Sequence, residues 1–295
     1  MDLWLGCLIA FVYGTVVGSF LNVCIYRLPA NQSIVNPPSH CPKCNAKLRA
    51  WDNIPLVSFL LLGRKCRYCG EPISWRYFAV ELLAGTLFVA TYLRYGYTID
   101  FFAYVLFVAA LLIAFFVDLD HLIIPDLVPM SAVVIGIGKD AAHWIAGDLR
   151  WARIWVPFAD YSVRMLPSLV GAVACFALFY AIAYVGFYAF RPRDEKAREQ
   201  YEGAMGGGDV MLAGGIGAVL GLVPALVSFF LAVLLGTLVG VTIVLLKSRA
   251  EKRGVPWRTE IPFGPYMVAG AVAVVLAYPQ LEAVWEAWMR FVTMS

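Results

Sequence analysis

Eight long apolar stretches run through this chain, and they constrain its fold more than any other feature. A helix that crosses the hydrocarbon core of a bilayer needs about 20 apolar residues. Charged residues make up 15% of the chain, against about a quarter in soluble domains, so too few polar side chains are available to cover these stretches in water. We therefore predict an all-α polytopic membrane protein with about eight transmembrane helices, at residues 3–25, 77–94, 99–117, 127–146, 165–189, 209–222, 225–246 and 263–281.

The lysines and arginines predict how these helices are oriented. Cytoplasmic loops of membrane proteins carry an excess of Lys and Arg. With eight spans, loops 26–76, 190–208 and 247–262 fall on one side and hold 17 of the 23 basic residues. We expect that side to be cytoplasmic. The net charge of +3 is too small to indicate a nucleic-acid partner, so the lipid bilayer is the expected environment.

Four of the seven cysteines form two C-x-x-C pairs in the largest polar insert. The pairs are Cys41/Cys44 and Cys66/Cys69, with 21 residues between them. Two such pairs can complete a tetrahedron around one metal ion, and the spacing is typical of four-cysteine zinc sites. Because disulfides rarely persist in the cytosol, we predict a structural zinc site. Free thiols or a redox pair are the alternatives, and His40 is an alternative ligand.

Aspartates lie at the cytoplasmic ends of two predicted spans. Asp118 and Asp120 end the third span, and Asp209 follows three glycines at the start of the sixth. Acidic residues are costly within a bilayer and tend to be functional there. When two carboxyl groups lie a few Å apart, one retains its proton while the ionised one can activate a water. Asp209 could therefore form, with Asp118 or Asp120, a catalytic pair that hydrolyses a peptide bond.

Other interpretations of these aspartates stay open at this point. Asp209 can instead be a helix N-cap, and the same carboxylates could carry ions in a transporter. A zinc-stapled assembly scaffold without catalysis is a third possibility. Asp120 is the main rival to Asp118, and because it lies two residues further on, it points about 200° away around a helix. Asp126 is expected to be a cap or turn residue of the fourth span, and His121 a solvated interfacial residue.

An ordered set of short motifs resembles the type IV prepilin peptidases, a family of membrane aspartyl proteases. Gly206-Gly-Gly-Asp209 is similar to the G-x-G-D motif of that family, and Asp118 followed by Ile124-Pro125 is similar to its first catalytic aspartate. The resemblance covers nearly the whole chain and departs from the family at Met211, where Lys is common, and at Phe78, where Pro is usual. The other matching segments are Gly18 to Pro29, Asp52 to Pro55, Ile73 to Tyr77 with Glu81, and Pro262 to Pro265.

The resemblance implies a bifunctional enzyme of the bacterial inner membrane. Such an enzyme cleaves the leader of type IV prepilins or pseudopilins at the cytoplasmic face, in type IV pilus assembly or type II secretion. It then N-methylates the new N-terminal residue with S-adenosylmethionine, an activity attached to the N-terminal half, where Glu81, Asp52 and Arg27 are candidate contributors. The expected regions are a first transmembrane helix at 1–25, a cytoplasmic zinc loop at 26–76 and a multi-span peptidase domain at 77–295.

Overall fold

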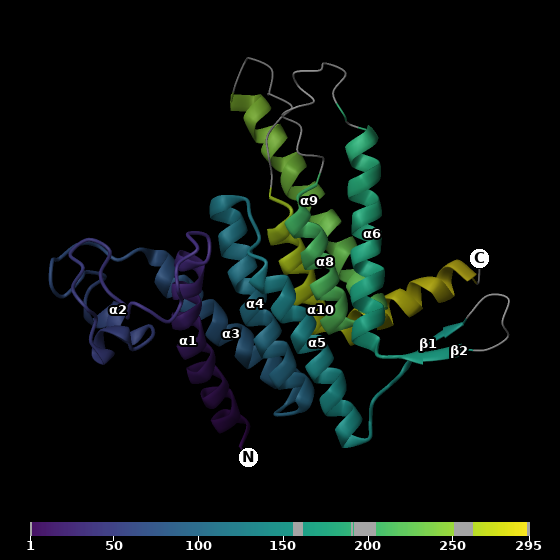
Figure 1. Ribbon diagram of the computed structural model, residues 1–295, viewed down its shortest axis with the longest axis horizontal. Helices are drawn as coiled ribbons and strands as arrows, with labels where there is room; N and C mark the ends of the chain where they lie inside the picture. The colour runs from purple at the N-terminus through teal and green to yellow at the C-terminus, as the bar shows by residue number, and fades with distance from the viewer. Residues whose placement is uncertain (1, 156–161, 190, 192–204, 251–261, 294–295) are drawn as a thin grey trace. The chain divides into compact units, whose positions relative to one another are not determined.

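A helix corresponds to each of the eight apolar stretches in the computed structural model (Figure 1). The structure describes residues 2–155, 162–189, 191, 205–250 and 262–293. It divides into two compact units, Met1–His121 and Leu122–Ser295. The helices are α1 (Leu3–Arg27), α3 (Trp75–Tyr95), α4 (Ile99–His121), α5 (Leu127–Ala146), α6 (Pro167–Ala189), α8 (Gly207–Leu220), α9 (Leu222–Ala250) and α10 (Gly264–Thr293).

Five helices are long and apolar enough to cross a membrane, judged by length and composition over the described residues. They are α1, α3, α4, α6 and the Leu222–Ile243 part of α9, while α8 and the Gly264–Ala277 part of α10 are shorter apolar helices. The polytopic helical class is thus confirmed, but the predicted count of eight spans is not. Helix α5 is not among these candidate spans, because the polar residues Lys139, Asp140 and His143 lower its mean hydropathy.

In the first unit, α1 packs along α3, and both helices contact α4. Close packing of α1 on α3 depends on small residues, because a Cβ added at Gly18 would lie 2.8 Å from the Cα of Glu81. The polar insert between α1 and α3 contains two short helical segments. These segments are η1 (Ala50–Asn53) and α2 (Val57–Leu61).

Aromatic packing attaches the insert to the first turns of α3. Phe59 of α2 is buried, and its ring centroid lies 5.2 Å from the centroids of both Trp75 and Phe78. Phe78 is one of the departures from the family pattern noted above, and here its ring fills a place in this aromatic cluster. The start of α3 is therefore packed against the insert.

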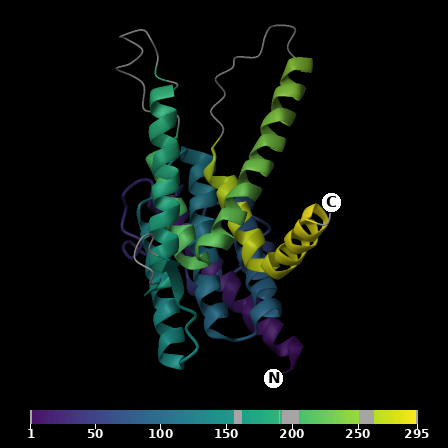
Figure 2. The same cartoon turned by 90° about the vertical axis from the view of Figure 1, so that its right-hand side faces the viewer.

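The second unit is built around α8. Every residue of α8 from Val210 to Val219 is buried except Met211. A Cβ added at Gly171 of α6 would lie 2.0 Å from the carbonyl oxygen of Gly217, so the two backbones touch. Small residues permit such close helix contacts without a side-chain layer. Figures 1 and 2 show α6 and α9 continuing beyond the Gly207 end of α8, the end that carries Asp209.

Two short strands interrupt the helical pattern. Strands β1 (Ala152–Trp155) and β2 (Ser162–Met165) pair antiparallel, with Arg153 opposite Arg164. No element is predicted there from the sequence, because four-residue strands are too short to show a distinct periodicity. The hairpin lies in the connection between α5 and α6, residues 147–166. Most basic residues of loops 190–208 and 247–262, on which the predicted orientation depends, lie outside the described residues.

Candidate metal centre and catalytic aspartates

The four predicted cysteines converge into one cluster. The sulfur atoms of Cys41, Cys44, Cys66 and Cys69 all lie within 4.8 Å of one another, a group that could hold a metal ion. The Sγ atoms of Cys41 and Cys69 are 3.9 Å apart, too far for a disulfide. Four sulfurs placed about 2.3 Å from a central ion in a tetrahedron would be about 3.8 Å apart. The cluster therefore fits a tetrahedral ion with four thiolate ligands.

Both cysteine pairs adopt the same turn. In each, the N–H of the first cysteine donates to the carbonyl oxygen five residues later, at 3.0 Å for Cys41 and 2.8 Å for Cys66. The fourth residue after each first cysteine has a positive φ, 56° at Asn45 and 74° at Gly70. Asn and Gly tolerate this conformation best. Local sequence therefore shapes each half of the site before any ion binds.

The thiols of the cluster differ in how readily they ionise. The backbone N–H of Cys44, aided by that of Lys43, lowers the pKa of Cys41 to about 7 despite burial. At Cys69 the N–H of Glu71 acts in the same direction, but burial and hydrogen bonds with the other three thiols outweigh it and raise the pKa of Cys69 to about 12. A dication among the four sulfurs would favour the thiolate form of all of them.

His40 does not belong to the cluster. Its Nδ1 lies 3.1 Å from the carbonyl oxygen of Pro38, to which it donates. The group of possible ligand residues contains cysteines alone. The alternative that His40 replaces a cysteine ligand is therefore not supported by the geometry.

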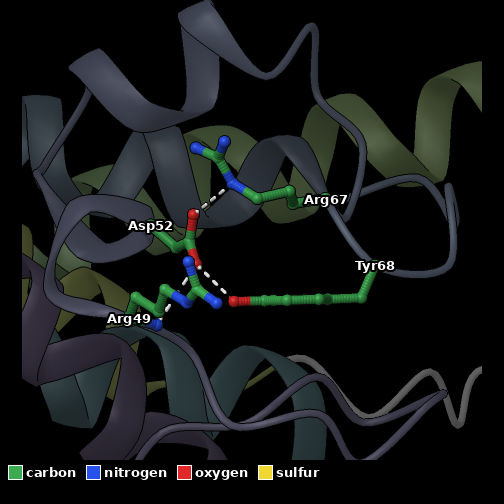
Figure 3. A network of polar contacts seen from close by, with 4 residues as sticks. All are labelled: Arg49, Asp52, Arg67 and Tyr68. Atoms are coloured by element: carbon green, nitrogen blue, oxygen red, sulfur yellow. Dashed lines mark hydrogen bonds and ion pairs between the residues drawn. The ribbon is translucent and has the colours of Figure 1, made fainter.

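Asp52 holds the two residues that lie inside the second cysteine pair (Figure 3). Its carboxylate accepts hydrogen bonds from Arg67 Nε at 2.8 Å, from Tyr68 Oη at 3.1 Å and from the backbone N–H of Arg49 at 3.1 Å. The Asp52 side chain is only 3% exposed. The hydrogen bond from Arg67, supported by those from Arg49 and Tyr68, holds the pKa of Asp52 below its usual value. Asp52 thus orients the turn that carries Cys66 and Cys69.

Two buried charges fasten the insert to α1 and α3. Arg27, at the end of α1, donates to the carbonyl oxygens of Ser33 at 2.9 Å and Pro37 at 2.8 Å. Glu81 of α3 accepts a hydrogen bond from the backbone N–H of Leu56 at 2.8 Å. Leu56 has φ 59° and ψ −48°, a conformation that is rare for a bulky residue. Glu81 therefore stabilises a strained turn of the insert.

Asp118 and Asp120, near the end of α4, lie in different surroundings. Asp118 is buried, with 6% of its surface exposed, whereas the side chain of Asp120 is 39% exposed. Asp120 forms an ion pair with Arg76 of α3. Because the two aspartates point about 200° apart around the helix, the partner of one does not serve the other. The contrast favours Asp118 over Asp120 as the functional carboxylate.

Asp209 lies in the first turn of α8. The N-cap of this helix is Gly206, whose carbonyl oxygen accepts a hydrogen bond from the N–H of Asp209 at 3.2 Å. The N-cap interpretation of Asp209 is therefore wrong. A half-buried carboxylate in the first turn is stabilised by the helix dipole. A Cβ added at Gly208 would lie 3.1 Å from the Cβ of Ile124, so this glycine allows the chain before α5 to approach the start of α8.

The remaining candidates occupy more ordinary positions. Asp126 is the N-cap residue of α5, as expected, although its side chain forms no capping hydrogen bond. His121 is the exposed last residue of α4. Met211, which stands where the family commonly has Lys, is 37% exposed on an otherwise buried helix. A longer polar side chain at this position would therefore not disturb the packing of α8.

Three residues with clear contacts at the site were not singled out from the sequence. Arg67 and Tyr68 are ordinary residues inside a C-x-x-C pair, and nothing in the sequence connects them to Asp52. For Arg76 a signal exists, because a cation in the first turn of a helix faces the positive end of the helix dipole. An arginine in that position indicates a partner outside its own helix, which here is Asp120.

Together these features define a helical polytopic membrane protein with a four-cysteine insert that could hold a metal ion and with a buried Asp118 and a half-buried Asp209 near helix ends. Residues 12–95 match the bacterial peptidase A24 N-terminal domain, and residues 105–241 match the type IV leader peptidase family. The chain belongs to the type IV leader peptidase family.

Several relatives are named prepilin leader peptidase/N-methyltransferase. The Myxococcus xanthus protein is 38% identical over 243 residues, which cover 82% of this chain and 64% of that protein. The Bacillus subtilis protein is 31% identical over 268 residues, covering 91% of this chain and 93% of that protein. The Pseudomonas aeruginosa protein is 30% identical over 292 residues, covering 91% and 89% respectively. No solved structure matches the chain.

Proposed function

We propose that this chain cleaves the leader peptides of type IV prepilins and pseudopilins at the cytoplasmic face of the bacterial inner membrane, with Asp118 and Asp209 as the catalytic pair. Membership of the type IV leader peptidase family supports the reaction. The observation that carries the choice of residues is the burial of Asp118 beside an exposed Asp120 that is paired with Arg76.

Chain connectivity supports the proposed pairing. Asp118 and Ile124 are separated by six residues along the chain, which span at most about 22 Å when fully extended. Ile124 in turn lies against Gly208, the residue before Asp209. The covalent chain therefore limits how far the first aspartate can lie from the glycines that precede the second.

In the proposed reaction the two carboxyl groups share one proton, because like charges a few Å apart do not both ionise. The ionised carboxylate removes a proton from a water, whose oxygen attacks the carbonyl carbon of the scissile peptide bond. The protonated carboxyl group donates a hydrogen bond to the developing oxyanion. As the C–N bond breaks, the protonated carboxyl group gives its proton to the leaving amine.

The cysteine cluster is proposed to bind one structural Zn²⁺. Four thiolates close the coordination sphere, so the ion would stabilise the insert rather than activate water. The second proposed activity is methylation of the new N-terminal amine with S-adenosylmethionine, supported by the names of the relatives. The proposed regions are residues 1–25 as the first transmembrane helix, 26–76 as the cytoplasmic, methyltransferase-associated zinc loop and 77–295 as the peptidase domain.

One experiment tests both activities. Purified enzyme is incubated with a prepilin and S-adenosylmethionine that carries a labelled methyl group, and the product masses are measured. We expect loss of the leader followed by addition of one labelled methyl group. Asp118→Asn and Asp209→Asn should yield neither product, while Asp120→Asn should still cleave. Ion or solute flux through liposomes without cleavage would favour a transporter. A scaffold without catalysis would tolerate both Asp118→Asn and Asp209→Asn.

A further inference from the structure

We infer that Arg76 is a positioning residue that sets the rotation of the last turn of α4 and hence the direction of Asp118. The inference rests on the proposed function of Asp118. The Arg76 guanidinium forms an ion pair with Asp120 and donates a hydrogen bond to the carbonyl oxygen of Phe116 at 3.2 Å. It also lies 5.3 Å from the centroid of the Phe116 ring.

These contacts lie on both sides of Asp118 along the helix. Phe116 precedes it by two residues and Asp120 follows it by two. A single ion pair would restrain the last turn of α4 at one position. One planar guanidinium that bonds to two positions of that turn restrains both the rotation and the translation of the turn. Because Asp120 and Asp118 point about 200° apart, holding Asp120 toward α3 fixes the opposite direction for Asp118.

The electrostatics of the two helices favour the same role. Arg76 lies in the first turn of α3, where its charge faces the positive end of the helix dipole. At the C-terminal end of α4 the same charge is favourable, and it offsets the carboxylate of Asp120 there. The Arg76 side chain is 31% exposed, so water screens the pair only in part. The position of Arg76 is thus unfavourable for its own helix and favourable for the neighbouring one.

The anchor for Arg76 is itself well held. Ser74 caps α3, and its hydroxyl oxygen accepts a hydrogen bond from the N–H of Arg76 at 3.3 Å. The adjacent Trp75 packs on the buried Phe59 of the insert and lies under the guanidinium of Arg64, 5.6 Å from the ring centroid. The first turn of α3 can therefore act as a fixed support for the last turn of α4.

The test is the kinetics of prepilin cleavage by Arg76→Ala, Arg76→Lys and Asp120→Asn. Misplacing a catalytic group by about 1 Å can cost about 100-fold in rate, so we expect Arg76→Ala to lower kcat about 10- to 100-fold with little change in KM. Arg76→Lys should recover part of the loss, because lysine keeps the ion pair but not the planar fork. Arg94→Ala is the matched control, an exposed arginine at the other end of α3 that contacts the Tyr95 ring.

Metal content and thermal stability are measured on the same preparations, since a merely structural defect would lower these and not the kcat of the folded fraction. If Arg76→Ala does not fold, a double-mutant cycle of Arg76→Lys and Asp120→Asn replaces it. A kcat of the double variant no lower than that of the less active single variant supports the inference. Losses of kcat that multiply in the double variant overturn it. Wild-type kcat in folded Arg76→Ala, beside an inactive Asp118→Asn, overturns the inference alone. Cleavage by Asp118→Asn overturns the proposed function instead.

Discussion

The cysteine insert, residues 28–74, and the α5–α6–α8 core are stabilised by opposite kinds of interaction. In the insert, the Asp52 carboxylate accepts hydrogen bonds from Arg67 and Tyr68, while Arg27 of α1 and Glu81 of α3 bond to the insert backbone, and the few buried apolar side chains include Phe59. In the core, helices touch through backbone atoms at glycines such as Gly171.

This difference teaches where each region is vulnerable. A small segment with few buried apolar residues cannot stabilise itself by the hydrophobic effect, so it needs a metal or other cross-links. A closely packed helical core tolerates polar changes at its surface but not an added methyl group at a contact. Single polar substitutions should therefore damage the insert, and single additions of volume should damage the core.

Removal of the metal should produce the largest effect of this kind. Structural zinc contributes about 10–16 kcal/mol in small zinc-binding peptides, so Cys66→Ser should lose the bound ion, the fold of the insert and methyl transfer. Leader cleavage should persist at a reduced rate, because the aspartates lie on other elements but Phe59 of the insert supports the first turn of α3, which carries Arg76. The measurements are metal content per chain and product mass, with Cys7→Ser, outside the cluster, as the control. Full metal content in Cys66→Ser, or loss of cleavage with methylation kept, would contradict the claim that a metal ion stabilises the insert.

An added methyl group in the core should cost less but still be clear. A Cβ at Gly136 of α5 would lie 2.4 Å from the carbonyl oxygen of Ala218, so Gly136→Ala should destabilise the protein by about 1–3 kcal/mol. Gly138, on the same helix, has nothing within 4 Å of its added Cβ. Gly138→Ala should be neutral or stabilise by up to about 1 kcal/mol. Thermal unfolding in detergent compares the two, and equal shifts would argue against backbone contact as the basis of the core.

A graded effect on metal affinity should follow from the Asp52 network. Residues that orient metal ligands typically contribute about 10- to 100-fold to affinity, and we expect a loss in that range for Asp52→Ala. Tyr68→Phe removes one of the three hydrogen bonds to Asp52 and should lose less. Competition with a chromogenic chelator measures both. Wild-type affinity in Asp52→Ala would separate this network from the metal site.

Much of the helical pattern and the cysteine cluster could be predicted, because long apolar runs and paired ligands are local features of the sequence. The division between α8 and α9 is one example: the predicted spans break at residues 223–224, and the structure places the break at Gly221, which ends α8 with φ 80°. Partners distant in sequence could not be predicted. Lys139 donates to the carbonyl oxygen of Val219 at 2.6 Å, and the buried Asp140 accepts from the N–H of Ser168 at 2.8 Å.

Lys139 and Asp140, neighbours on α5, thus bond to the ends of α8 and α6, and these bonds depend on how the helices pack. The same holds for Arg76, whose partner is 44 residues away. Asp118 could be preferred to Asp120 from motif spacing, but the burial that separates them depends on the tertiary structure.

The central claim is that Asp118 and Asp209 act as one catalytic unit, and a double-mutant comparison tests it most directly. Initial rates of leader cleavage are measured for Asp118→Asn, Asp209→Asn and the variant that carries both changes, in membranes with equal amounts of folded enzyme. Residues that work as a unit are strongly non-additive, so either single change should reduce the rate to the background and the second change should add nothing. A near-normal rate in either single variant, or two partial losses that multiply, would contradict the account.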